Sequence, residues 1–271
     1  MRSRWPIVLP GPLFPVWQAR GAVAAGWLAW DMLTEPYPGR PLVGGVVLNL
    51  AGVTAGDDLA ANTSLALAAC NAAATASARH VFLCSSAAVY GPGAGDDLHE
   101  DDPLHPTSAY GRAKQGMEQA ARDWHAAQPA GGPGLTILRI GNVVGCDSLI
   151  GRAHSGRQVM LDPVPGNPGG PVRSYIGPCA LANILMQLCR QAVAGDNLPE
   201  VLNICADPPV AMADLLSAAG IPWRYGPPAP QVISRVVLST ARLRQYITLP
   251  VCGGQAQALI DDWRKVDAQT P

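Results

Sequence analysis

The sequence predicts an α/β fold, a doubly wound parallel sheet. Short apolar runs of strand length alternate with longer helical stretches along the first half of the chain, as they do in βαβ units. One such run, Val46-Val47-Leu48-Asn49-Leu50, is apolar almost without a break, which is typical of a parallel strand buried on both faces. With 271 residues the chain is long enough to bury a substantial core.

The N-terminal region predicts three strands. Phe14–Arg20 favours a strand, which Pro15 confines to an early or edge position because proline lacks an N–H. Trp27–Met32 predicts a second short strand, with Asp31 near its end. Residues 46–50 form the third and end at Ala51-Gly52.

Helices then alternate with strands. Asp57-Asp58 offers an N-cap for an alanine-rich helix over 59–78, and a strand over 81–84 follows. Ser108 is the expected N-cap of a helix from Tyr110 to Ala126. The glycines between 131 and 134 end that unit, and 135–140 predicts another strand.

The pattern loosens in the second half of the chain, where 155–174 is rich in glycine and proline and predicts a long loop. The remaining expected helices cover 178–193, 211–219, 240–246 and 255–266, and the remaining strands 201–205 and 236–238. We therefore expect two parts. Residues 1–145, joined by the strand near 201–205, form the sheet domain, and residues 146–271 mostly form a small C-terminal substrate-binding lobe.

Charge and hydropathy narrow the class of partner. The net charge is −1 and no run of lysines or arginines occurs, which argues against nucleic acid or an anionic membrane surface. No apolar stretch reaches the roughly 18 residues that span a bilayer. Four prolines interrupt what would be the apolar region of a signal peptide: Pro6, Pro10, Pro12 and Pro15. We expect a small-molecule substrate, no nucleic acid and no membrane.

The cysteines point to a reducing compartment. There are seven, an odd number, without a CxxC pair, and most lie in apolar runs, such as Cys84, Cys189 and Cys205. We interpret them as small buried hydrophobic residues of a cytoplasmic protein, not as a disulfide framework or a metal site. The five histidines show no ligand spacing, so no metal is expected.

Residues 81–114 carry the chemistry. An apolar strand delivers Ser85 and Ser86 at its carboxyl end, and carboxyl ends of parallel strands line the ligand crevice of such folds. Tyr110 and Lys114 stand four residues apart and so share a helix face. An ammonium beside a phenol favours the phenolate, so we expect Lys114 to lower the pKa of Tyr110 and make it an acid–base group.

This combination resembles the extended short-chain dehydrogenase/reductases, the NAD-dependent epimerase/dehydratase-like group. The family's strand ends in SSxxVYG, and an acidic E-D-x-P-x-x-P loop then leads to YGxxK. Here the corresponding segments are Ser85–Gly91, Glu100–Pro106 and Tyr110–Lys114. The segments 138–145, 173–176 and 201–204 are similar to the family's LRxxNVxG, R-x-[FY]-[IV] and YNIG. The resemblance runs from about residue 14 to 247 and implies a Rossmann-like fold.

The resemblance implies roles for five residues of the reaction site. Tyr110 is the acid/base, Lys114 tunes it and holds the nicotinamide ribose, and Ser86 polarises the substrate oxygen. Asn142 faces the substrate near the nicotinamide, and Arg173 is a candidate for a substrate phosphate. The family usually has an Asp shortly after this Arg, whereas residues 177–179 here are Gly-Pro-Cys, so the sequence leaves a sugar nucleotide open as substrate.

A second group concerns the cofactor, NAD or NADP. The resemblance implies that Asp31 contacts the adenine and that Ala51 and Gly52 wrap the cofactor. Ser85, at the strand end, is a further candidate cofactor contact. Arg20 follows the predicted strand over 14–20, which ends without an acid, and could meet a 2′-phosphate, which slightly favours NADP.

The family's opening strand and GxxGxxG loop, which binds pyrophosphate at a helix N-terminus, have no counterpart in this sequence. In one account, 14–20 and 27–32 are strands two and three, strand one is absent, and the true N-terminus lies upstream of Met1. In the other, Ile7-Val8-Leu9 is strand one and 15–25 is a short helix, but Pro12 removes an N–H that phosphate needs. We favour the first account.

Two functions remain open at this stage. The leading hypothesis is an NAD(P)-dependent oxidoreductase, epimerase or dehydratase that acts on a hydroxyl or carbonyl group, of a nucleotide sugar for example. The alternative is a non-catalytic binding or scaffold protein that has lost the glycine loop. By analogy with the family, a homodimer through the YxxxK helix and the helix before it is a further expectation.

Overall fold

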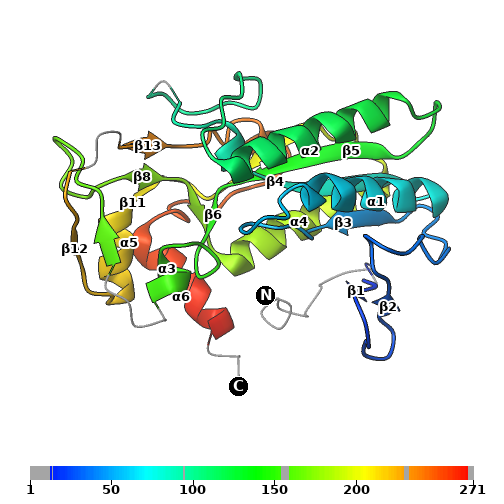
Figure 1. Cartoon of the computed structure of the whole chain (residues 1–271), viewed down its shortest axis with the longest axis horizontal. Helices are drawn as coiled ribbons and strands as arrows, with labels where there is room; N and C mark the ends of the chain where they lie inside the picture. The colour runs from blue at the N-terminus through cyan, green and yellow to red at the C-terminus, as the bar shows by residue number, and fades with distance from the viewer. Residues whose placement is uncertain (1–12, 14, 94, 154–158, 229–231, 268–271) are drawn as a thin grey trace.

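A four-stranded parallel sheet forms the centre of the computed structural model, which describes residues 13, 15–93, 95–153, 159–228 and 232–267. Its strand order is β10-β5-β4-β3, and all three pairings are parallel (Figure 1). The strands are β3 (Val46–Asn49), β4 (His80–Ser86), β5 (Gly134–Ile140) and β10 (Val201–Ile204). The predicted α/β fold with a parallel sheet is therefore confirmed.

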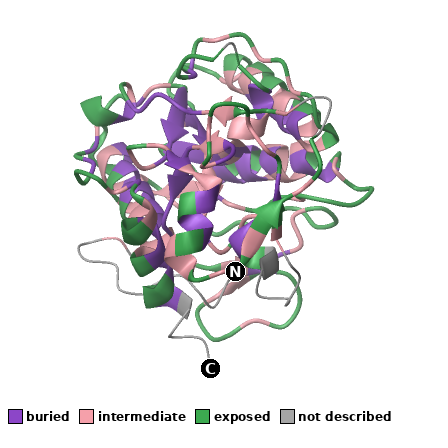
Figure 2. Cartoon of the chain, turned by 90° about the vertical axis from the view of Figure 1, so that its left-hand side faces the viewer, coloured by how far each residue is buried: buried purple, intermediate pink, exposed green. Residues whose placement is uncertain are grey.

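Helices cover both faces of this sheet. α1 (Ala61–Thr75) and α2 (Ala109–Ala126) pack on one face, where small alanines of α1 meet Val81 and Leu83 of β4. α4 (Pro178–Ala194) covers the other face, where its leucines meet Phe82. Side chains alternate along a strand, so the apolar run of β4 is buried on both sides, as Figure 2 shows for the centre of the molecule.

The alanine-rich helix begins later than predicted, because Asp57 and Asp58 do not cap it. Its N-cap is Ala60, without a side-chain hydrogen bond, and both aspartates are exposed. The turn before the helix is closed by the Ala61 N–H, which donates to the backbone carbonyl of Asp58 at 3.2 Å. Ser108, by contrast, caps α2 as predicted, since its hydroxyl accepts the N–H of Gly111 at 3.0 Å.

The C-terminal half contains more strand than the sequence predicted. The expected loop over 155–174 holds β7 (Val159–Leu161) and β8 (Val172–Arg173), and the expected helix over 240–246 is only the 3-10 turn Leu243–Gln245. These short strands pair with partners distant in sequence, which local patterns do not reveal. The other elements of this half are α3 (Ile150–Ala153), α5 (Met212–Ala219), α6 (Ala256–Asp267), β6 (Asn142–Val143), β9 (Tyr175–Ile176), β11 (Val210–Ala211), β12 (Trp223–Tyr225) and β13 (Arg235–Val236).

The N-terminal strands form a separate two-stranded sheet. β1 (Gln18–Ala19) pairs in parallel with β2 (Leu28–Ala29), and within the described residues neither strand pairs with β3. The helix over 15–25 in the second account is therefore wrong, since β1 lies inside that range. The strand proposed at 7–9 lies outside the described residues. Among those that are described, β3 has one strand neighbour, β4, so it lies at an edge of the sheet.

A carboxylate from α6 caps the N-terminus of α4. Gly177 precedes this helix and offers no side chain, but the carboxylate of Asp262 accepts the N–H groups of Cys179 and Ala180 at 2.9 and 3.1 Å. A Cβ on Gly177 would lie 2.1 Å from Asp262 Oδ2, so only glycine admits this contact. An acid from a distant helix thus satisfies the N–H groups that a local Asp would otherwise have capped.

His80 is a buried neutral imidazole at the start of β4. The Thr136 hydroxyl donates to the carbonyl of Pro199 at 2.8 Å, so it accepts its 2.9 Å hydrogen bond from His80 Nε2–H. Burial, followed by the charge of His125, lowers the pKa of His80 from 6.5 to about 4. In the folded state, His80 is therefore neutral at pH values well above 4.

We predict that Asp262→Ala lowers the free energy of unfolding by about 1–2 kcal/mol, because two N–H groups at the start of α4 lose a charged acceptor. Urea denaturation of the parent and the variant measures this difference. Asp261→Ala, an exposed neighbour on the same helix, is the control and should change stability by less than about 0.5 kcal/mol. Equal effects of the two substitutions would contradict the capping role.

We predict that His80 makes the fold sensitive to acid. Because its folded-state pKa is about 4 and its ordinary value is 6.5, the unfolded chain binds the proton first as the pH falls. Neutral His80 therefore contributes roughly 3 kcal/mol to the free energy of unfolding above pH 6.5, and this contribution is lost as the pH falls towards 4. Urea midpoints across this range should fall less for His80→Gln than for the parent or for the control at exposed His99, His99→Gln. Parallel curves would refute the assignment.

Candidate active site

The carboxyl end of β4 and the start of α2 meet at the candidate active site. Ser86 ends the strand and caps the 3-10 turn Ala87–Val89, since its hydroxyl accepts the N–H of Ala88 at 3.2 Å. α2 approaches this turn closely at Gly111, where a Cβ would lie 2.4 Å from the Ala88 carbonyl oxygen. Glycine at this position therefore lets the first turn of α2, which carries Tyr110, lie beside Ser86.

The predicted catalytic residues are brought together. The Tyr110 phenol lies near the Ser86 hydroxyl, which lowers the pKa of the phenol, and both side chains are half-buried. Lys114, one turn further along α2, is almost fully buried, and its Nζ lies 6.0 Å from the centre of the Tyr110 ring. That ammonium donates to the Cys84 carbonyl oxygen at 2.8 Å, so it links α2 to β4.

The prediction that Lys114 lowers the pKa of Tyr110 is wrong for this structure. Burial raises the pKa of Tyr110 to about 12, the neighbouring Cys84 thiol adds to the rise, and only the Ser86 hydroxyl lowers it. Burial also lowers the pKa of Lys114. The reason is geometric, because the ammonium is directed at the strand carbonyl and not at the phenol. Tyr110 is therefore a protonated group, poised as an acid.

Gly52 contributes a close backbone approach. A Cβ there would lie 3.1 Å from Lys114 Nζ and 3.0 Å from Asn62 Oδ1, so this surface is kept free of side chains beside the ammonium. Asn62 in turn holds the chain after β3, since its amide donates to the Val53 carbonyl at 2.9 Å. Ala51 and Gly52 are both exposed. These features fit the ribose end of a nicotinamide cofactor, which needs Lys114 and a bare backbone together.

The pyrophosphate end of that cofactor has no comparable fit. Within the described residues no glycine-rich turn joins a strand to a helix N-terminus beside β3, which is the edge of the sheet. Arg20 and Asp31 lie just after β1 and β2. Arg20 is exposed, and an Asp31 carboxylate oxygen accepts the N–H of Leu33 at 3.0 Å within its own turn. They belong to the separate two-stranded sheet.

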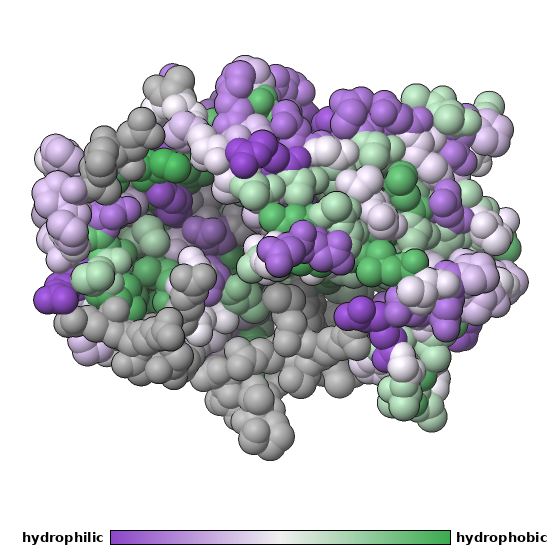
Figure 3. Space-filling view, in the orientation of Figure 1, coloured by the Kyte–Doolittle hydropathy of each residue, from purple (hydrophilic) through white to green (hydrophobic). Residues whose placement is uncertain are grey.

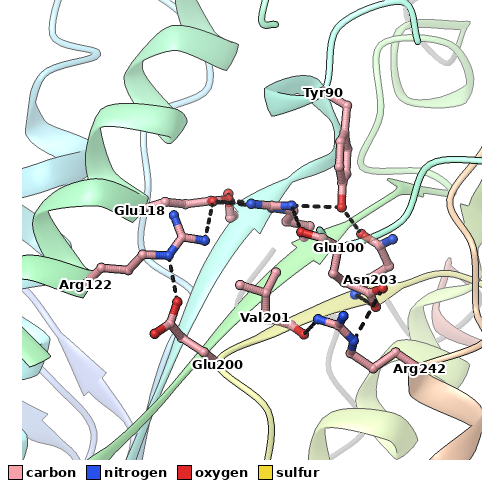
Figure 4. A network of polar contacts seen from close by, with 10 residues as sticks. Tyr90, Glu100, Glu118, Arg122, Glu200, Val201, Asn203 and Arg242 are labelled. Carbon is pink, nitrogen blue, oxygen red and sulfur yellow. Dashed lines mark hydrogen bonds and ion pairs between the residues drawn. The ribbon is translucent and has the colours of Figure 1, made fainter. Parts of the chain in front are cut away.

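Ser85 lies on the opposite face of β4 from Ser86. Its hydroxyl donates to Glu118 Oε1 at 2.6 Å, and both residues are buried (Figure 4 shows the surrounding polar contacts). The Glu118 carboxylate also binds Arg139 of β5, with Arg139 Nη2 2.8 Å from Glu118 Oε2. The Ser85 hydroxyl is thus committed to the protein interior and not directed to a cofactor.

The polar network continues from Arg139 across the sheet. Arg139 Nη1 donates to the Tyr90 hydroxyl at 2.9 Å, and that hydroxyl donates to Asn203 Oδ1 of β10 at 2.7 Å (Figure 4). The Asn203 N–H donates to Glu100 Oε1 at 2.9 Å, which ties the acidic loop to the sheet. Sequence analysis missed Glu118 and this network. The signal was a charged residue, Arg139, inside an otherwise apolar strand.

The candidate substrate residues lie where the sheet domain meets the C-terminal half. Asn142 is the register partner of Tyr175, whose hydroxyl donates to Asp147 Oδ2 at 3.0 Å. The guanidinium of Arg173 donates to the carbonyls of Val172 and Ile233 at 2.8 and 2.7 Å. Burial lowers the pKa of Arg173, and the charges of Tyr175 and Asp162 oppose this. Arg173 is therefore a half-buried cation whose described hydrogen bonds run to carbonyl oxygens, an arrangement that could accept an anion.

Other classes of site receive no support from the described part of the chain. No group of three or more His, Cys, Asp or Glu side chains there could hold a metal ion. No helix there combines the length and the apolar character needed to cross a membrane. Three cysteines are buried as expected (Cys70, Cys189 and Cys205), while Cys146 and Cys252 are exposed. Figure 3 shows hydrophilic and hydrophobic residues interspersed over the visible face.

Comparisons with known proteins bear on the fold and the family. A UDP-glucose 4-epimerase of Lacticaseibacillus casei is 27% identical over 195 residues, which cover 62% of this chain and 58% of the relative. The matched region thus spans less than two thirds of that relative's length.

Two solved structures share the fold. One is TunA, an NAD-dependent NDP-hexosamine 5,6-dehydratase involved in tunicamycin biosynthesis, with a TM-score of 0.68 and 21% identity over 88% of this chain and 83% of that one. The other is the UDP-glucose 4-epimerase of Bifidobacterium longum in complex with NAD⁺ and UDP, with a TM-score of 0.63 and 20% identity over 83% of this chain and 77% of that one.

The family is shown by a match to a family sequence profile. The sequence profile of the NAD dependent epimerase/dehydratase family matches residues 46–205, from β3 to the end of β10. That span includes Ser86, Tyr110, Lys114 and the buried network beneath them, and it is more than half of the chain. The chain therefore belongs to the NAD-dependent epimerase/dehydratase family.

Proposed function

We propose that this chain is an NAD(P)-dependent epimerase or dehydratase that acts on a hydroxyl-bearing carbon of a nucleotide sugar. The observation that carries the proposal is the assembly of Ser86, Tyr110 and Lys114 at one strand end. The similar proteins bind NAD, UDP or NDP-sugars, as their names state, which supports the cofactor and the substrate class.

In the proposed reaction, Ser86 donates a hydrogen bond to the substrate oxygen, and Tyr110 transfers the proton that this oxygen gains or loses. When bound, NAD would supply the acceptor and donor of a hydride exchanged with the carbon that bears this oxygen. Lys114 and the bare backbone at Gly52 would hold the nicotinamide ribose. Because the pKa of Tyr110 is about 12, its phenol is protonated at neutral pH. It can act as a base only if additional positive charge nearby lowers that pKa.

Arg173 would bind a phosphate of the substrate, since its guanidinium is half-buried and bonded to carbonyl oxygens. We further propose that Arg20, which is exposed just after β1, meets the adenosine end of the cofactor and slightly favours NADP.

The second candidate is a non-catalytic binding protein. It is favoured by one observation, the lack of a glycine-rich pyrophosphate cradle among the described residues, with β3 at the edge of the sheet. In this alternative the Tyr110–Lys114 pair only joins α2 to β4. Retention of NAD or NADP through purification, measured by absorbance and fluorescence, would exclude this candidate.

We predict that Tyr110→Phe lowers kcat by about 10²- to 10⁴-fold on UDP-glucose with added NAD, because the substrate oxygen loses its proton partner. Turnover is measured by coupled assay for the 4-epimer and by absorbance for a 4-keto product. KM and the thermal midpoint should change little, since the ring remains. The control is Tyr225→Phe, an exposed tyrosine outside the site. Full activity of Tyr110→Phe would refute the assigned role.

We predict that Arg173→Gln raises KM for the nucleotide sugar about tenfold and leaves kcat nearly unchanged, because a charged hydrogen bond to phosphate is lost. Arg244→Gln, which breaks an exposed ion pair with Asp207, should leave KM unchanged. Binding of the free sugar, which carries no phosphate, should be the same in the parent and in Arg173→Gln. If KM for the nucleotide sugar is also the same in both, the phosphate role is wrong.

A further inference from the structure

The carboxylate of Glu118 joins the two elements that carry the candidate catalytic groups. Glu118 lies on α2, two turns after Tyr110, and is completely buried. It accepts the Ser85 hydroxyl from β4 at 2.6 Å, and Ser85 directly precedes Ser86. Of the side-chain hydrogen bonds near the site, this one and the bond from Lys114 to the Cys84 carbonyl run directly between β4 and α2.

Arg139 makes this buried carboxylate stable. It is the register partner of Ser85 in the β4–β5 pairing, so it rises from the sheet next to the same carboxylate. Arg139 Nε lies 3.1 Å from Glu118 Oε1, and Arg139 Nη2 lies 2.8 Å from Glu118 Oε2. A carboxylate with this many charge-assisted partners has little rotational freedom, so Ser85 meets a fixed acceptor.

The same carboxylate lies one helical turn from Lys114. Burial lowers the pKa of Lys114, and the charges of Cys84 and then Glu118 raise it again. The groups near Lys114 are Cys84 from β4, Asn62 of α1, and Tyr110, Met117 and Glu118 from α2. Glu118 is the only carboxylate among these named groups, so it is the acid that favours the charged form of Lys114.

We propose that Glu118 is a positioning residue, which holds Ser86 and Tyr110 in register by fixing Ser85 on β4 against α2. This role rests on the proposed function, because it concerns the same reaction. This role for Ser85 differs from the cofactor contact that the sequence suggested. The Ser85 hydroxyl and the Glu118 carboxylate are both buried beneath the site, where they would not touch a cofactor or a substrate. In this proposal the surrounding network fixes the distance between Ser86 and Tyr110, in addition to packing the core.

The test is Ser85→Ala, which removes the cross-link but leaves the Glu118–Arg139 ion pair intact. We expect kcat to fall about tenfold with KM changed less than about twofold, because sub-ångström misplacement of reacting groups affects turnover more than binding. The pH profile of kcat should also shift, since the Ser86 hydroxyl lowers the pKa of Tyr110 and would no longer be held in place beside it. An unchanged kcat and pH profile would overturn the proposal.

The matched control is Ser239→Ala. Ser239 is also a buried serine with a single short-range hydrogen bond, from the Ala241 N–H at 3.3 Å, and it lies in neither β4 nor α2. Ser239→Ala should therefore leave both kcat and KM close to the values of the parent. If both variants lower kcat equally, the effect of Ser85 is general destabilisation, and the positioning role is wrong.

A second measurement does not depend on turnover. Hydrogen exchange followed by mass spectrometry should show about tenfold faster exchange over residues 84–91 and 108–118 in Ser85→Ala, with no change in α4. Glu118→Gln should show the same pattern where it folds. If exchange responds in this way while the parent is inactive on every nucleotide sugar, the proposed function fails but the cross-link stands. If exchange is unchanged, the positioning proposal itself fails.

Discussion

The ion pair between Glu118 and Arg139 is the interaction on which the candidate site depends. Two full charges are removed from water at the centre of the molecule, and such a pair is tolerated only when further hydrogen bonds satisfy its remaining atoms. Here Ser85, Tyr90 and the Glu100 carbonyl supply those bonds. Loss of Glu118 would leave the Arg139 charge buried without a carboxylate, and loss of Arg139 would leave Glu118 with the partly exposed Arg122, whose Nη2 lies 3.6 Å from Glu118 Oε2. The ion pair therefore helps to hold α2, β4, β5 and the acidic loop together.

That requirement explains why the reactive groups lie where they do. Ser86 and Tyr110 are only half-buried and make few bonds of their own, so their positions follow from the elements beneath them. Small residues complete the geometry, because Gly111 admits α2 to the strand end and Gly52 leaves bare backbone beside Lys114. The candidate site thus combines a buried polar network with half-buried groups above it, an arrangement that would suit the acid–base role proposed for them.

The proposed cofactor site has two unequal halves. The end proposed for the ribose has the Lys114 ammonium beside bare backbone, whereas the described residues offer no cradle for the pyrophosphate. β3 has the apolar composition of a central strand but stands at the edge of the sheet, without the charges or prolines that usually protect such edges. These two observations concern the same side of the molecule.

The sequence by itself determined the sheet, the helix that carries Tyr110 and Lys114, and the placing of Ser86 at a strand end. Apolar periodicity and caps are local properties, and the motif at 85–114 is contiguous enough to be recognised. Only the tertiary structure decided that Ser85 is directed inward, that Lys114 is directed at Cys84 and away from the phenol, and that Asp262 caps α4. Each of these depends on contacts between residues distant in sequence, on burial and on the direction of single side chains, which no spacing along the chain encodes.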